Sequence, residues 1–456
     1  MISIYEKEQA LRFRPEGFEY VRFDDEDFTR AFLSCFSRAS QATVILGPGG
    51  AGKSEILKMV AAHFGHDCIL LTPTGIAAHN IENPWSTPRT IHSGLGLPVM
   101  PIIPADRIFS KPLEALHEKE VVMIDEISMV NAPLLDAIIR HIEEASKSRR
   151  RRIKLICLGD EYQLQPPFDE EKMRPILHRY PNLKDRWSFL KSEKLRELNP
   201  EVFVLKAVYR QSNPVFKEVL SHIRMGIPDR QDISYLNTRV VPEPDRKALV
   251  LASTNREVDI VNTKHLSELG RNQKPMVYDA EFIMGSKITD CGFSSHLELF
   301  KGQRVMCTRN LYDENGTPIF HNGTLGTVVD FRYQDGEMLP VVRADDGRLF
   351  VVPFMQFHES AYIKNDEGKY EYLPIAEAIM IPLKSAYSMT FHKAQGLTLD
   401  KVHLIVPERR PQPGMMYLGC SRVRTPEGLS LSSEVSKEMF SLSTAKKEKD
   451  GEEPIR

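Results

Sequence analysis

The chain has 456 residues, which is long enough for about two to four domains with sizeable cores. Charged residues make up 27% of it and hydrophobic residues 41%, as in ordinary globular proteins, and the formal net charge is −2. This balance excludes nucleic-acid binding through a global positive field, so any such binding would need a local groove.

Cysteine usage and the N-terminal residues indicate the compartment. The six cysteines are scattered without a C-x-x-C pair, which favours a reducing compartment and argues against a zinc site. The first residues lack the basic segment and apolar core of a signal peptide, and no apolar run approaches the ~18 residues of a membrane span. We therefore expect an intracellular, cytoplasmic protein with no membrane partner, associated with the nucleoid if the source is prokaryotic.

A phosphate-binding loop follows an aromatic-rich N-terminal segment. That segment carries one predicted helix over 24–38, with apolar residues at helical spacing. A predicted strand over 42–46 and a predicted helix over 55–64, which begins at Glu55, flank the loop. The loop matches G-x-x-x-x-G-K-[ST] in full, in residues Gly47, Pro48, Gly49, Gly50, Ala51, Gly52, Lys53 and Ser54.

The loop residues have the chemistry of nucleotide binding. Glycines let backbone N–H groups close around phosphate oxygens, and a helix N-terminus adds its positive end. Lys53 would reach the β and γ phosphates, and Ser54 would offer its hydroxyl to Mg²⁺. The alternative is a chance Gly-rich turn, which the strand–loop–helix context disfavours.

The next predicted strand, over 67–71, runs into Thr72, Pro73, Thr74 and Gly75. Hydroxyls and a helix N-terminus at the carboxyl edge of an α/β sheet can bind a ligand, although a capped helix start is the simpler interpretation. Residues 83–111 are rich in Pro and Gly and too irregular for a sheet strand. We expect a small excursion there, which carries Thr90 and His92.

Two more predicted strands end in polar residues. The strand over 121–124 ends in Asp125 and Glu126, where the first carboxylate can hold Mg²⁺ and the second can accept a proton from the attacking water. Such a pair is often merely solvated, but its place downstream of a phosphate loop favours catalysis. The strand over 153–158 leads to Gln163, which can sense a γ phosphate or belong to a plain turn. Between them, a helix over 132–146 ends in an arginine run over 149–152, which we interpret as a solvated helix end rather than a nucleic-acid contact.

In the second part of the chain, the pattern of predicted helices and strands changes twice. A helix ending near 226, a strand over 248–253 and a helix beginning near Asn255 indicate a further α/β unit. Short β-rich runs at 303–307, 324–331, 341–343 and 349–353, separated by Asn-Gly and Asp-Gly turns, predict a small inserted β-barrel. Residues 384–406 return to the α/β pattern, and the charged residues 446–453 indicate a disordered tail.

Ten segments resemble, in the same order, superfamily 1B DNA helicases of the Pif and Dda types, and more distantly the RecD group. The resemblance covers about 43–431, and its segments are GPGGAGKS, LLTPTGIAA, TIHS, MIDEIS, LGDEYQL, YRQSNPVF, FKGQRVM, HNGTLGTV, SMTFHKAQGLTLD and YLGCSRV. It implies an α/β fold with two RecA-like P-loop motor domains, ATP and Mg²⁺ as cofactors, and ATP-driven 5′ to 3′ translocation on single-stranded DNA with duplex unwinding.

The resemblance also implies domain limits and partners. The first motor would span 1–168 with a wedge insert at about 83–111, and the second 169–310 and 380–432. An SH3-like β insert would span 311–379, with a tail over 433–456. The implied partners are single-stranded and forked DNA, with G-rich four-stranded DNA as a candidate, and the motor would act as a monomer.

Residue roles follow from the same resemblance. The implied catalytic residues are Lys53, Asp125, Glu126, Gln163, Arg210 and Arg422, with the two arginines reaching the γ phosphate from the second motor domain. Glu55 and Gly396 join the nucleotide-binding set. The implied single-strand track comprises Thr72, Pro73, Thr74, Gly75, Thr90, His92, Asn255, Ser388, Thr390, His392 and Lys393.

One departure from the family affects nucleotide choice. The family carries a glutamine that reads adenine upstream of the phosphate loop, whereas residues 23–28 here contain none, so we expect weaker adenine selectivity. An RNA helicase or a single-strand translocase that displaces proteins stays open as an alternative. A nucleotide-switched DNA-binding scaffold is less favoured, because Glu126, Arg210 and Arg422 each serve turnover.

Overall fold

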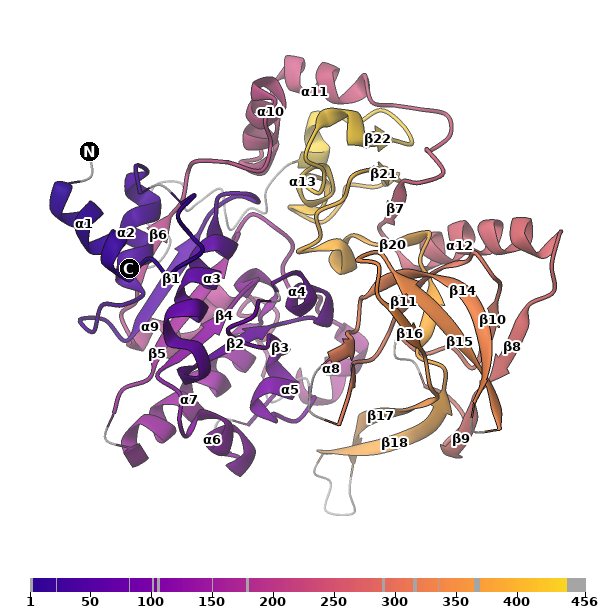
Figure 1. Ribbon diagram of the computed structural model, residues 1–456, viewed down its shortest axis with the longest axis horizontal. Coiled ribbons are helices and arrows are strands. Elements are labelled where there is room, and N and C mark those ends of the chain that lie inside the picture. The colour runs from indigo at the N-terminus through magenta and orange to yellow at the C-terminus, as the bar shows by residue number, and fades with distance from the viewer. Residues whose placement is uncertain are drawn as a thin grey trace.

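The structure, a computed structural model, describes residues 3–440 apart from 22, 82, 101, 105–106, 150, 178–179, 289–291, 315–317, 335 and 365–369. Two parallel sheets lie in separate α/β units, and a group of antiparallel strands lies beside the second (Figure 1). The predicted α/β class with a β insert is confirmed. No helix within these limits is long and apolar enough to cross a membrane.

The first sheet is wholly parallel, with strand order β3-β2-β4-β5-β1-β6. Its apolar, β-branched runs are buried on both faces, as parallel sheets require. The strands are β1 (Ala42–Leu46), β2 (Cys68–Thr72), β3 (Arg89–Thr90), β4 (Val121–Ile124), β5 (Lys154–Gly159) and β6 (Glu201–Val204). The expectation that 83–111 holds no sheet strand is wrong for β3, which pairs with the end of β2 through Leu71 and Thr72.

Strand β6 extends the first unit beyond its expected end. It pairs in parallel with β1, and Leu205 directly after it belongs to the same buried core. The limit expected at 168/169 therefore falls inside this unit. The reason is that the chain forms the short helices Glu170–Leu177 and Glu193–Glu197, with Phe189 and Leu195 in the core of the first unit, before it returns to the sheet edge.

Helices cover both faces of the first sheet (Figure 1). Those predicted over 24–38, 55–64 and 132–146 are present as α2, α3 and α7. The helices of this unit are α1 (Ile4–Phe13), α2 (Glu26–Ser34), α3 (Lys53–Phe64), α4 (Gly75–Asn80), α5 (Ile91–Leu95), α6 (Ser110–Leu116), α7 (Ala132–Arg149), α8 (Glu170–Leu177) and α9 (Glu193–Glu197).

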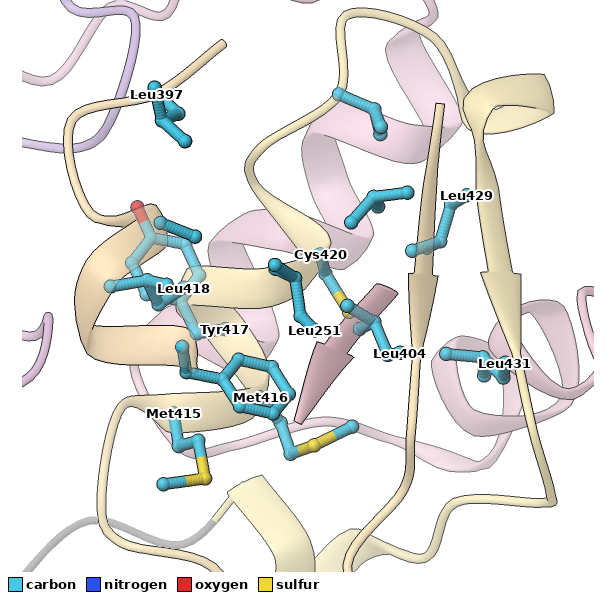
Figure 2. Close-up of a cluster of buried hydrophobic side chains, with 14 of the residues drawn as sticks. Leu251, Leu397, Leu404, Met415, Met416, Tyr417, Leu418, Cys420, Leu429 and Leu431 are labelled. Atoms are coloured by element: carbon cyan, nitrogen blue, oxygen red, sulfur yellow. The ribbon is translucent and has the colours of Figure 1, made fainter. Parts of the chain in front are cut away.

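The second sheet is smaller, with order β20-β7-β21-β22, and it too is parallel. Its strands are β7 (Leu249–Ala252), β20 (Ser388–Thr390), β21 (Val402–Leu404) and β22 (Leu429–Leu431), and its helices are α10 (Pro214–Arg224), α11 (Arg230–Asn237), α12 (Asn255–Gly270) and α13 (Met415–Cys420). Figure 2 shows how the side chains of α13 meet Leu251, Leu404 and Leu431 of the strands in one core. This core holds α13 against the sheet.

The antiparallel strands form the insert. They are β8 (Met276–Asp279), β9 (Glu281–Met284), β10 (His296–Leu299), β11 (Arg304–Cys307), β12 (Leu311–Tyr312), β13 (Pro318–Phe320), β14 (Leu325–Gln334), β15 (Glu337–Ala344), β16 (Leu349–Val351), β17 (Met355–Lys364), β18 (Tyr370–Met380) and β19 (Leu383–Ser385). Five of them make the sheet β16-β15-β14-β11-β19, around a separate core. The strands begin at Met276 and end at Ser385, so they extend beyond 311–379 on both sides.

One turn of the insert packs closely against α4 of the first unit. A Cβ on Gly75, at the start of α4, would lie 2.6 Å from the carbonyl oxygen of Asn322. Gly323 has a φ of +98°, and a Cβ there would lie 1.8 Å from Ile76 Cγ1. Only glycine fits this φ and this spacing without strain, so the turn is shaped to meet α4.

Part of the expected tail is packed. Val435 and Phe440 are buried in the core of the second unit, and Asn237 holds the segment through hydrogen bonds with the backbone of Val435. Residues 441–456, including the charged run over 446–453, lie outside the described residues.

We predict that Phe440→Ala lowers the free energy of unfolding of the second unit by about 3–5 kcal/mol, because it empties a buried aromatic site. A urea titration followed by circular dichroism measures this. Lys437→Ala, at an exposed position three residues earlier, is the control and should leave the transition unchanged. Equal midpoints for the two variants would contradict the packing of this segment.

Candidate nucleotide-binding cleft

One cavity of about 790 Å³ lies at the carboxyl ends of β1, β4 and β5. Residues from both units line it, because the second unit faces this edge of the first sheet. Twelve residues predicted from the sequence contribute: Gly49, Gly50, Gly52, Lys53, Ser54, Glu55, Asp125, Glu126, Gln163, Arg210, Gly396 and Arg422.

The phosphate loop has the conformation that its glycines allow. Gly50 and Gly52 have φ values of +84° and +89°, and a Cβ on Gly50 would lie 2.3 Å from Arg210 Cβ. Lys53 Nζ donates to the carbonyl oxygens of Gly47 and Pro48, at 2.7 and 2.9 Å, and burial lowers the pKa of Lys53. The ammonium is therefore folded onto its own loop, at the place where a phosphate would compete for it.

The two carboxylates after β4 differ in environment. Asp125 is buried and accepts a hydrogen bond from the Glu126 N–H at 2.9 Å, and burial followed by the neighbouring Glu126 charge raises the pKa of Asp125. Glu126 has a φ of +50°, in the left-handed region that non-glycine residues rarely adopt. A buried carboxylate that shares a cleft with the Ser54 hydroxyl fits Mg²⁺, which takes one or two protein oxygens and completes its shell with phosphate and water.

Asp160, after β5, joins the two units. It is fully buried, and Arg224 of α10 donates to its Oδ1 from Nε and Nη2, at 3.1 and 2.9 Å. Although burial opposes ionisation, Arg224 holds the pKa of Asp160 below its usual range. Gln163 Nε2 contacts Asp160 Oδ2 at 3.3 Å, while Gln163 Oε1 is buried without a partner. Tyr417 of α13 also donates to Asp160 Oδ2, at 3.0 Å, and accepts from Gly49 N–H at 3.3 Å.

Arg210 and Arg422 converge on the phosphate loop. A Cβ on Gly49 would lie 3.6 Å from Arg210 Nη1 and 3.7 Å from Arg422 Nη2. Burial, with the charge of Arg422 beside it, lowers the pKa of Arg210 to about 10, and Arg210 Nη1 is buried without a partner. Arg422 comes from the second unit, as expected, whereas Arg210 lies on the segment between β6 and α10 that connects the units. An anion between the two guanidinium groups would satisfy them.

Sequence reasoning missed the aromatic part of the cleft. Tyr20, Phe28 and Tyr209 line it, the Phe28 ring lies 2.9 Å from where a Gly52 Cβ would be, and Tyr209 donates to Asp25 Oδ2 at 2.9 Å. Phe28 lies in the segment 23–28 that lacks the expected glutamine. The three rings offer stacking, which does not distinguish one base from another. The helical spacing over 24–38 predicted only a buried position for Phe28. Arg424 and Thr398 also line the cleft and gave no sequence signal.

The residues predicted for the single-strand track lie outside this cavity, at edge strands of the two sheets. Thr72 and Thr90 are paired neighbours at the β2–β3 edge. Thr72 is buried and donates to the Thr74 carbonyl at 2.8 Å, while Thr74 and Thr90 accept from backbone N–H groups of α4 and α5. His92 is half-buried, and burial lowers its pKa. Pro73 and Gly75 complete this group.

The second group lies at the β20–β7 edge of the other sheet. Thr390 pairs with Ala252, and the exposed Asn255 begins α12 shortly after. Ser388 Oγ and His392 Nε2 are buried without hydrogen-bond partners, and burial lowers the pKa of His392. Lys393 follows in the same turn. The structure thus places the predicted nucleotide residues and the predicted track residues in different locations.

The arginine run over 149–152 lies at the far end of α7. Arg151 forms an ion pair with Glu120, and Arg152 lines a separate cavity beside β5. Arg150 is outside the described residues.

The parallel sheets and the cleft between them define a P-loop nucleotide-binding protein with two RecA-like units.

Comparisons with known proteins show what the chain is similar to. A family model described as an AAA domain matches residues 27–185. The ATP-dependent DNA helicase PIF1 of Homo sapiens is 28% identical over 402 residues, covering 85% of this chain and 58% of that protein. The chain therefore spans less than two thirds of the length of this relative.

Solved structures agree with this family over nearly the whole chain. Pif1 helicase from Bacteroides in complex with ADP-AlF3 and single-stranded DNA is 26% identical, with a TM-score of 0.77, and the match covers 95% of this chain and 99% of that chain. Unliganded Pif1 from Bacteroides, at the same identity, has a TM-score of 0.60 and coverage of 95% and 98%. The chain is thus similar in sequence and fold to Pif1 helicases, and its units are arranged more as in the complex than as in the unliganded protein.

We predict that Lys53→Ala reduces nucleoside triphosphate hydrolysis by on the order of 10²-fold or more, because the loop loses the cation that would hold the β and γ phosphates. Phosphate release at saturating nucleotide measures it. Lys58→Ala is the matched control, since Lys58 lies further along α3, away from the glycine loop, and forms an ion pair with Glu55. Full turnover in the Lys53 variant would contradict the assignment of the loop.

Proposed function

We propose that this chain is an ATP-dependent DNA helicase that moves 5′ to 3′ along single-stranded DNA and unwinds duplexes, and that it hydrolyses ATP between its two RecA-like units. The cleft carries this proposal. It gathers a lysine, two carboxylates, a glutamine and two arginines, the groups that phosphoryl transfer uses for positioning and charge neutralisation.

Each residue has a defined part in the proposed hydrolysis. Lys53 and the loop amides hold the phosphates, and Arg210 and Arg422 stabilise the charge that builds on the γ phosphate. Ser54 and Asp125 would hold Mg²⁺, which would supply positive charge beside the phosphates. Glu126 accepts the proton of the attacking water, and Gln163, whose Oε1 lacks a partner, senses the γ phosphate.

The proposed DNA track explains the unpaired groups at the sheet edges. Single-strand binding without sequence preference needs backbone contacts along a groove, which hydroxyls, imidazoles and N–H groups can supply without a large positive charge. Ser388 and His392 present buried polar atoms that lack a partner. The greater similarity to the DNA-bound Bacteroides structure supports a closed arrangement around such a strand.

We predict that the protein separates a duplex with a 5′ single-stranded tail in the presence of ATP and Mg²⁺, and leaves a duplex with only a 3′ tail intact. A strand-displacement assay on both substrates measures this. Glu126→Gln is the control: it should still bind nucleotide and DNA, with turnover reduced about 10²–10⁴-fold if Glu126 is the base.

The same assay separates the alternatives. Unwinding from the 3′ tail would contradict the proposed polarity. Hydrolysis stimulated by a single strand without separation of either duplex would indicate a translocase that displaces proteins, and stimulation by RNA alone would indicate an RNA helicase. Binding of DNA with negligible hydrolysis would favour a nucleotide-switched scaffold.

We predict that His392→Ala weakens the binding of a short DNA single strand, because the unpaired Nε2 is lost from the proposed track, while hydrolysis at saturating DNA stays near wild type. Fluorescence anisotropy at fixed salt measures the binding, since ionic strength changes such affinities strongly. His403→Ala is the matched control, because His403 bonds to Ser430 within the second sheet. Unchanged binding with lost hydrolysis would move His392 from the DNA track to the nucleotide site.

A further inference from the structure

Gln395 of the second unit contacts the proposed catalytic base of the first. It directly follows the 3-10 turn Phe391–Ala394, and only 1% of its surface is exposed. Its Nε2 lies 3.1 Å from Glu126 Oε2 and 3.0 Å from Ser128 Oγ. The contact therefore crosses the interface between the units.

The chemistry of the partners fixes the orientation of the amide. An ionised carboxylate accepts hydrogen bonds and donates none, so the nitrogen rather than the oxygen of Gln395 must face Glu126. This hydrogen bond therefore restricts the direction in which the Glu126 carboxylate points.

Stability alone does not account for this residue. Gln395 Oε1 is buried without a hydrogen-bond partner, which is unfavourable, and a well-packed apolar side chain would avoid that loss. Glu126 itself has left-handed backbone angles, φ +50° and ψ +44°, which persist only where surrounding groups enforce them. A bond from the opposite unit is one such constraint on the carboxylate.

We propose that Gln395 is a positioning residue that holds the Glu126 carboxylate ready to accept a proton only while the two units are closed. The proposal rests on the proposed ATP hydrolysis. In that step the water oxygen bonds to the γ phosphorus as the bond to the ADP oxygen breaks, and a water proton passes to Glu126. When the cleft opens, Glu126 loses this contact and its orientation.

The same turn reaches the proposed DNA track. Gln395 N–H donates to the His392 carbonyl at 3.3 Å, so a single helical turn separates the residue assigned to DNA from the residue that holds the base. A strand bound at His392 would favour the position of the turn in which Gln395 meets Glu126. In this way, DNA binding would raise the rate of ATP hydrolysis through Gln395.

The test is Gln395→Met, which keeps the length of the side chain and removes the donor. We expect kcat for ATP hydrolysis with saturating single-stranded DNA to fall roughly 10- to 100-fold, with KM for ATP and DNA affinity unchanged. Gln303→Met is the matched control, because it removes a buried, hydrogen-bonded glutamine from the β insert. In Gln395→Asn the side chain is too short to reach Glu126, so kcat should fall as in Gln395→Met. This variant is the test if the methionine variant does not fold.

A double-mutant cycle separates positioning from a general structural effect. If Gln395 acts through Glu126, adding Gln395→Met to Glu126→Gln should lower the single-turnover rate no further. A further loss in the double variant, an unchanged kcat in both single Gln395 variants, or a rise in KM with kcat retained would overturn the proposal. A wild-type protein without ATP hydrolysis would instead overturn the proposed function, and the role of Gln395 with it.

Discussion

The ion pair between Asp160 and Arg224 is the contact on which the cleft depends. Asp160 is fully buried and Arg224 is 12% exposed, and each comes from a different unit, so their opposite charges offset each other's loss of hydration when the units meet. Two hydrogen bonds from Arg224 and one from Tyr417 satisfy the carboxylate together. Separating the units would break the bonds from Arg224 and Tyr417 and leave Asp160 with its contacts to the Tyr162 N–H and to Gln163, so the ion pair favours a closed cleft with a defined orientation.

Closure concentrates positive charge where phosphate charge is expected. Arg210 and Arg422 face the same loop as Lys53, and burial shifts the pKa of each toward the neutral form. Cations held this close repel one another in a poorly solvated space, and a triphosphate would relieve that repulsion. The interface therefore suits an anionic ligand, and a bound nucleotide would stabilise the same closed arrangement of the units as the Asp160–Arg224 ion pair. In our proposal, the same closure brings Gln395 into contact with Glu126, the proposed catalytic base.

Runs of apolar residues predicted the elements of the fold that depend on residues adjacent in the chain. The apolar runs at β1 and β4 were assigned with their observed limits, since parallel strands buried on both faces are continuous in sequence. Strand β3 was missed because two residues carry no periodicity. Strand β6 was missed because its partner β1 is far away in the chain. The burial of Phe440 was missed because one aromatic residue in a charged segment does not reveal which core it packs into.

The sequence by itself determined the phosphate loop, the carboxylates after β4 and the order of the motifs, because each rests on residues adjacent in the chain. It also indicated the resemblance to superfamily 1B helicases, since ten such segments occur in one order. Only the tertiary structure decided that Tyr20, Phe28 and Tyr209 share the cleft, that Asp160 meets Arg224, and that Gln395 meets Glu126. These contacts join residues far apart in the chain, so they depend on how two separately folded sheets pack, and no short pattern of residues encodes that packing.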